Sequence, residues 1–163
     1  MSRVQVGPQW VRSWDTATPV ARSSAELETL LRRYGAHGYT VSNDYMGGTL
    51  VVGFTLPATW QVKTDQTVDV RLAVSYGETR RRLGRMPQFV SKSRGKGESW
   101  ALEQAERVAW RHLLLWAEAS LAAAAAGIQT VEESFFAHTV VPSSGARVID
   151  HVNEQRLLRG AST

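Results

Sequence analysis

A chain of 163 residues with 43% apolar and 21% charged residues has the composition of one folded domain with a hydrophobic core. It contains no cysteine, which excludes disulfides, thiolate nucleophiles and thiolate metal sites. The net charge is +4, but residues 79–97 alone hold seven basic side chains and no acidic one; the rest, with 12 basic and 15 acidic residues, carries −3. This pattern favours a polyanionic partner, or else a charged loop that only keeps the protein in solution.

Residues 1–22 have no regular pattern and are expected to form an extended arm, with Trp10 and Trp14 as candidate anchors. Residues 23–163 are expected to form a single α+β domain. The N-terminus lacks the continuous apolar stretch of a signal peptide, and the most apolar segment, from Leu113, is too short for a membrane span. We therefore expect a cytoplasmic protein without membrane contact.

The first predicted helix follows this arm. Ser23 and Glu26 have the spacing of a capping box, in which the hydroxyl and the carboxylate satisfy free backbone N–H groups. The helix then repeats apolar residues at helical spacing, at Leu27, Leu30, Leu31 and Tyr34. Gly35 or Gly38 is expected to end it.

Three strands follow. Residues 39–45 and 50–56 alternate apolar and polar side chains on either side of Met46, Gly47 and Gly48, which predicts a β-hairpin. Residues 67–76, TVDVRLAVSY, alternate most regularly, with Asp69 and Arg71 on the polar side. One face of the sheet is therefore expected to be buried beneath a helix.

The basic segment contains Gly84, Pro87, Gly95 and Gly97 and is predicted to be a loop. A long helix is predicted from about Glu98 to Ala126, with Gly127 as its stop. Its predicted stripe is Leu102, Ala105, Ala109, Leu113, Trp116 and Leu121, widened by Val108, Leu114 and Leu115. Such a broad apolar surface is expected to pack on the sheet and also on a second copy or the C-terminal helices.

Two short helices complete the chain. Thr130 and Glu133 form a second capping box ahead of Phe135 and Phe136, and residues 148–158 are predicted to be helical. The predicted fold class is α+β: an N-terminal helix, a three-stranded antiparallel sheet, a long helix packed on it and short terminal helices.

Catalytic chemistry is not expected. None of the four histidines lies three or four residues from another, so the sequence lacks the histidine spacing of a metal site on a helix. His112 is expected to be a packed or interfacial residue, and no serine has a G-x-S-x-G setting. We predict no enzyme, no metal and no cofactor, unless a pocket gathers His112 or His138 with carboxylates.

Phosphate binding is the chemistry that the basic segment favours. Residues 91–97, SKSRGKG, enter the predicted helix N-terminus, where free N–H groups and the helix dipole attract anions. Trp100, Tyr76 and Phe89 are candidates for base stacking, with core packing as the alternative for each. The predicted nucleic-acid-binding residues are Arg80, Arg81, Arg82, Arg85, Lys92, Arg94, Lys96 and Trp100.

Part of the long helix and the segment after it, AWRHLLLWAEASLAAAAAGIQTVEESFFAHTVVP, resemble a family of uncharacterised phage and prophage proteins from Gram-positive hosts. The matching residues are Trp110-Arg111, Gly127-Ile128 and Phe135-Phe136-Ala137-His138. The resemblance covers residues 25–142 and implies a phage context, hence the host cytoplasm, without implying an activity.

A weaker similarity is to the single-strand annealing superfamily that includes RecT, Erf and Red-beta. It rests on the order of the elements and on KGESWALEQAERVAW, with Lys92, Arg94 and Lys96 as the matching basic positions. It implies single-stranded DNA binding or annealing in DNA recombination or replication, often as a homo-oligomeric ring. Double-stranded RNA-binding domains share three strands followed by a helix, so double-stranded RNA is a second candidate ligand. The alternative function is a protein–protein interaction module acting on a host or phage protein.

Overall fold

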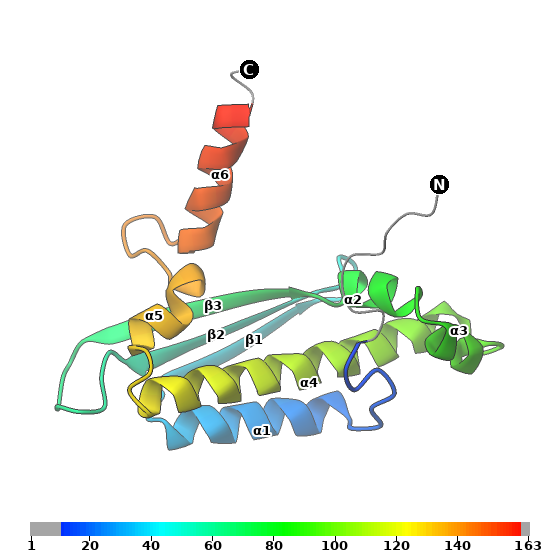
Figure 1. Cartoon of the computed structure of the whole chain (residues 1–163), viewed down its shortest axis with the longest axis horizontal. Coiled ribbons are helices and arrows are strands. Elements are labelled where there is room, and N and C mark those ends of the chain that lie inside the picture. The colour runs from blue at the N-terminus through cyan, green and yellow to red at the C-terminus, as the bar shows by residue number, and fades with distance from the viewer. Residues whose placement is uncertain (1–10, 161–163) are drawn as a thin grey trace.

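The computed structural model (Figure 1) describes residues 11–160, with side chains to residue 157. It has an antiparallel sheet of strands β1 (Gly38–Asp44), β2 (Thr49–Pro57) and β3 (Thr67–Ser75), in that order. Helices α1 (Val20–Arg33) and α4 (Gly97–Ala125) lie side by side on one face of the sheet. Helices α2 (Tyr76–Leu83) and α3 (Pro87–Ser93) lie at one end, while α5 (Val131–Phe135), the 3-10 turn η1 (Phe136–His138) and α6 (Val148–Gly160) follow α4. The predicted α+β class is confirmed.

The strands follow the predicted alternation. Leu50, Val52, Phe54 and Leu56 of β2 are at most 4% exposed, and the residues between them face outward. The hairpin closes at the pairing of Asp44 with Thr49, and the Asp44 carboxylate accepts hydrogen bonds from the Met46 and Gly47 N–H groups. The hairpin prediction is therefore confirmed.

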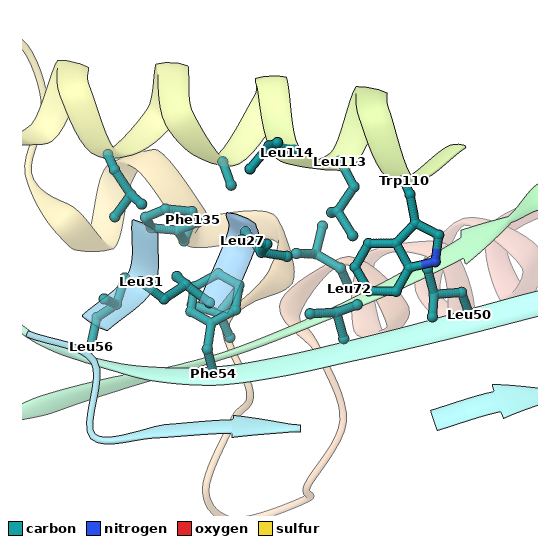
Figure 2. Close-up of a cluster of buried hydrophobic side chains, with 14 of the residues drawn as sticks. Leu27, Leu31, Leu50, Phe54, Leu56, Leu72, Trp110, Leu113, Leu114 and Phe135 are labelled. Atoms are coloured by element: carbon teal, nitrogen blue, oxygen red, sulfur yellow. The ribbon is translucent and has the colours of Figure 1, made fainter. Parts of the chain in front are cut away.

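The main core lies between the sheet and the two long helices. Figure 2 shows Leu27 and Leu31 of α1 and Trp110, Leu113 and Leu114 of α4 meeting the sheet residues Leu50, Phe54, Leu56 and Leu72. Phe135 of α5 enters the same layer, with its ring centroid 5.6 Å from that of Phe54 and 5.4 Å from that of Trp116. We call this cluster the sheet-side core.

The start of α1 differs from the prediction. The helix begins at Val20, with Pro19 in the N-cap position and no side-chain cap, so it takes in the last residues of the segment predicted as an arm. Ser23 is fully buried inside the helix, and Glu26 pairs with Arg22 and Arg111 instead. The capping box at Ser23 was wrong because Pro19, with its fixed φ, starts the helix one turn earlier. The second box is confirmed, since Thr130 and Glu133 exchange hydrogen bonds of 2.7 and 3.0 Å.

The breadth of apolar surface on α4 is used within the chain. A second cluster joins Leu83, Met86 and Phe89 of the α2–α3 region to Ala101, Ala105 and Val108 of α4, and we call it the basic-end core. Leu102, predicted in the buried stripe, is 37% exposed because Ala101 and Ala105 occupy the contact with α2 and α3. The helix ends as predicted, with Gly127 at φ +74° after the cap residue Ala126. Within residues 11–160, no helix is long and apolar enough to cross a membrane.

Candidate nucleic-acid interface

Most of the predicted loop is helical, and only short turns at residues 84–86 and 94–96 interrupt it. Helix α2 covers Tyr76–Leu83 and begins where the Ser75 hydroxyl accepts a hydrogen bond from the Glu78 N–H at 3.1 Å. Pro87 sits in the first turn of α3, where its missing N–H costs nothing. Gly84 has an ordinary right-handed φ of −62° as the cap of α2. The loop prediction was wrong for residues 79–93, because Gly84 and Pro87 mark helix ends here, and it holds only for the turn around Gly95. We call α2, α3 and the turn into α4, residues 76–98, the basic end.

The basic end is held by the basic-end core. Leu83, Met86 and Phe89 are at most 2% exposed and pack against α4. The chain before α1 joins this packing through Val11 and Trp14. Buried Gln104 of α4 fixes it there, because its Nε2 donates to the carbonyls of Trp14 and Thr16 at 3.0 and 2.9 Å. The cations are therefore carried on a packed corner.

Arg80 makes structural contacts within the protein. Its guanidinium makes a bidentate ion pair with Glu98, with Nε–Oε1 and Nη2–Oε2 distances of 3.0 and 2.8 Å, and lies 5.7 Å from the Phe89 ring centroid. The hydrogen bonds from Arg80 lower the pKa of Glu98 below its ordinary value. Arg80 thus joins α2 to the start of α4.

Arg81 and Arg82 are exposed and share one carboxylate. Both pair with Glu78, at 2.7 and 3.0 Å, and their side chains are 69% and 67% exposed. Ion pairs this exposed contribute little free energy and exchange readily for another anion. The side chains of these two arginines are therefore free to bind another anion, such as a phosphate.

Four further cations complete the basic end. Arg85, Lys92, Arg94 and Lys96 are exposed, and no carboxylate in the described part of the chain forms an ion pair with them. The Lys92 ammonium lies 5.5 Å from the Trp14 ring centroid and that of Lys96 lies 4.4 Å from the Trp100 centroid. With Glu78 and Glu98 included, residues 78–98 hold seven basic and two acidic side chains, a net charge of +5.

The three candidate stacking residues differ in burial. Tyr76 is 4% exposed, and its hydroxyl donates to Asn43 Oδ1 at 3.1 Å; Phe89 is 1% exposed. These two rings belong to the packing of the fold. Trp100 is half-buried and stacks on Phe89 with a centroid distance of 5.8 Å and an interplanar angle of 26°.

The N-terminus of α4 already has its own anion. Lys96 occupies the N-cap position without a side-chain cap, and Gly95 and Gly97 have φ of +75° and +79°. Glu98 stands in the first turn, where its charge complements the helix dipole. The exposed side chains, more than this helix end, are therefore the groups that can meet a phosphate.

Sequence reasoning missed the residues that organise this surface. Glu78 and Glu98 lie one residue outside the acid-free window of residues 79–97, where Glu98 pairs with one arginine of the window and Glu78 with two. Nothing in the sequence indicated the role of Gln104, apart from its being a polar residue in an apolar stretch. Trp14, a predicted anchor of the arm, packs against the basic-end core, whereas Trp10 lies outside the described residues.

A groove of about 350 Å³ runs between β3 and α4 and brings His112 and His138 to its lining. His112 Nε2 donates to the Arg12 carbonyl at 2.6 Å, and His138 packs edge-on against Trp116. Burial, with Arg147 nearby, lowers the pKa of His138 and favours the neutral imidazole. Within the described part of the chain the lining includes no Asp or Glu, so neither histidine has there the carboxylate partner that would orient a base.

Asp150 and His151 near the C-terminus have partners of their own, away from the groove. Asp150 makes a bidentate pair with Arg147, and His151 Nε2 lies 2.8 Å from the Ser144 hydroxyl. Across residues 11–160, no group of three or more His, Asp or Glu side chains is arranged to hold a metal ion.

No family model matches the chain, and neither the curated proteins nor the solved structures contain a significant match. The resemblances to phage proteins and to the annealing superfamily therefore stay predictions, and the function has to be argued from the side chains.

Proposed function

We propose that this chain is a nucleic-acid-binding protein that holds a phosphate backbone on the basic end. The observation that carries the proposal is the set of six exposed cations on one packed corner: Arg81, Arg82, Arg85, Lys92, Arg94 and Lys96. Only Glu78 pairs with any of the six in the described part of the chain.

The packing beneath the cations favours a ligand over a merely solubilising role. A charged loop that only prevents aggregation needs no core of its own, whereas α2 and α3 rest on fully buried Leu83 and Phe89. The residues outside 78–98 carry a net charge of −1, so the excess positive charge of the chain is concentrated in this segment. Each phosphate contact releases counterions, and six contacts to a single strand give a salt slope of about −4.

Fluorescence anisotropy of labelled single-stranded DNA, duplex DNA and duplex RNA, titrated at several salt concentrations, tests the proposal. The Arg81→Glu/Arg82→Glu variant is expected to bind at least about tenfold more weakly at low salt, with a slope less steep by about 1.4 on single strands. Arg80 is left intact because its reversal would break the contact with Glu98 and disturb the fold.

The matched control is Arg32→Glu/Arg33→Glu. These residues also form an arginine pair in the last turn of a helix, and Arg32 pairs with Glu28 four residues earlier, just as Arg82 pairs with Glu78. The control variant is expected to bind like the wild type. Absence of binding at low salt, or equal weakening by both variants, would reject the basic end as the binding surface.

A wider role, annealing of complementary strands in phage recombination or replication, follows from the resemblance to the annealing superfamily. It requires a homo-oligomer that presents many basic ends along one strand. The rate at which complementary oligonucleotides anneal, with and without the protein, tests this role. Light scattering with DNA present tests the assembly.

A protein–protein interaction module is the second candidate, and α6 is the feature that favours it. This helix projects away from the body of the molecule (Figure 1), and its Val152 and Leu157 are 37% and 75% exposed. In that case Val152→Ser/Leu157→Ser would abolish biological activity. The variant Arg81→Glu/Arg82→Glu would then leave activity nearly unchanged.

A further inference from the structure

We propose that Trp14 and Trp100 are two base-stacking platforms, each covered in the free protein by a lysine that moves to a phosphate when a base arrives. The ligand that fits is a single strand with unstacked bases. This inference rests on the proposed function. It adds to that function the type of nucleic-acid strand and the side chains on which its bases stack.

Trp100 takes part in a series of contacts between cations and aromatic rings. The Arg80 guanidinium lies over Phe89, Phe89 stacks on Trp100, and the Lys96 ammonium lies over Trp100. Arg80 and Phe89 cannot move away, because Arg80 is held by Glu98 and Phe89 is 1% exposed. Only the lysine, on a flexible stem, can leave without disturbing the fold.

Trp14 repeats the arrangement from another part of the chain. The Lys92 ammonium lies over its ring, and Gln104 of α4 holds its backbone carbonyl. The preceding residue, Ser13, has φ of +56°, a left-handed conformation unusual for a residue with a side chain. Residues in such conformations cluster at functional sites, which favours a binding role for Trp14.

Both lysines stand where a nucleobase would stand. No carboxylate in residues 11–157 forms an ion pair with Lys92 or Lys96, and an exposed cation–aromatic contact is weak. A phosphate is a stronger partner for the ammonium. The same movement that makes the phosphate contact therefore opens the ring for the attached base.

Stacking on a side chain selects the strand type. Inside a duplex, both faces of a base are covered by its neighbours, whereas a single strand can turn a base outward onto an indole ring. The proposal thus favours single-stranded DNA over duplex DNA and over double-stranded RNA.

An abasic oligonucleotide separates stacking from phosphate binding. It has the same length and phosphates as an oligo-dT but lacks its bases. Wild-type protein is expected to bind oligo-dT about fivefold to hundredfold more tightly than the abasic strand for each platform used. Trp14→Leu and Trp100→Leu are each expected to remove part of this preference, and Lys96→Gln is expected to keep the preference while lowering the salt slope by about 0.7.

Trp60→Leu is the matched control. Trp60 is also half-buried, but it packs on Tyr34 with its Nε1 donating to the Tyr34 carbonyl, outside the basic end. This variant is expected to retain the full preference for oligo-dT. Circular dichroism establishes that each variant is folded.

The outcomes distinguish the two proposals. If wild-type protein binds oligo-dT and the abasic strand equally, phosphate binding stands and the stacking platforms are rejected. If it binds neither at low salt, the proposed function itself fails. A preference for oligo-dT that survives both tryptophan substitutions would also overturn the inference. If either variant fails to fold, the comparison of oligo-dT with the abasic strand on wild-type protein still tests the inference, because it needs no variant.

Discussion

The two hydrophobic clusters of this molecule differ in size and in what they hold. Within the described residues, the sheet-side core contains 18 buried residues and the basic-end core contains six. The larger cluster joins the strands to helices α1, α4 and α5 and to Tyr76 at the start of α2, whereas the smaller one joins the α2–α3 region to the first turns of α4. Helix α4 belongs to both. The sheet-side core therefore determines the fold, while the basic-end core positions cations and indole rings on a corner that we expect to open separately.

A buried leucine from each cluster makes the comparison quantitative. Leu27 and Leu83 are both fully buried. We expect Leu27→Ala to cost about 4 kcal/mol of unfolding free energy, because its neighbours on the sheet and α4 cannot move into the vacated space. Urea denaturation, followed by circular dichroism, measures it. A cost below that of Leu83→Ala would reverse the ranking of the two clusters.

Leu83→Ala is expected to cost about 2–3 kcal/mol, since α2 is short and can shift toward the vacated space. Its characteristic effect is local: amide exchange should accelerate in α2 and α3 before it does in the sheet. Binding of single-stranded DNA should weaken, although no cation has been removed. Uniform acceleration of exchange across the whole chain would show that the two clusters open as one unit.

The buried residues of the sheet-side core could largely be predicted from the sequence. Alternation in residues 50–56 and 67–76 identified the inward side chains, and the Met46-Gly47-Gly48 stretch identified the hairpin. Periodicity works there because each element buries one face against a broad layer. It placed Leu102 wrongly because α4 meets two different clusters, and the buried face changes along the helix.

Of the basic end, the sequence predicted only the concentration of positive charge and not the arrangement of the side chains. Its charge was evident, but Arg80 and Glu98 are 18 residues apart, and Gln104 and Trp14 are 90 apart. Contacts of that kind depend on where the short helices pack, which no local pattern reports. For the same reason, sequence reasoning treated all seven cations as equivalent, whereas Arg80 is a structural residue and the other six are exposed.

Gln104 tests how the chain before α1 is attached to the basic end. Gln104→Ala leaves the carbonyls of Trp14 and Thr16 without their donor, at an expected cost of about 1–2 kcal/mol. Amide exchange in residues 11–18 should accelerate most, and the contribution of Trp14 to single-strand binding should fall. Gln155→Ala, on the exposed surface of α6, should change neither quantity. Unchanged exchange in residues 11–18 would show that other contacts hold this segment.

The smallest expected effect is the pH dependence of the Arg80–Glu98 pair. The folded protein holds the pKa of Glu98 below its ordinary value of 4.5, so the pair contributes stability above that pH. The contribution is lost as the pH falls through the lowered folded-state pKa, because the unfolded chain then binds the proton more readily. Since Glu98 is 64% exposed, it amounts to no more than about 1 kcal/mol.

Glu98→Gln isolates this contribution from those of the other carboxylates. The variant should be less stable than the wild type at neutral pH, and the difference in urea midpoint should close as the pH falls below 4.5. Glu103→Gln, a change of an exposed α4 carboxylate, should show no such pH-dependent difference. A difference between Glu98→Gln and wild type that stays constant down to acid pH would mean that Glu98 acts through packing or helix capping. Arg80 would then hold the basic end through its contact with Phe89, and its ion pair with Glu98 would contribute nothing to holding it in place.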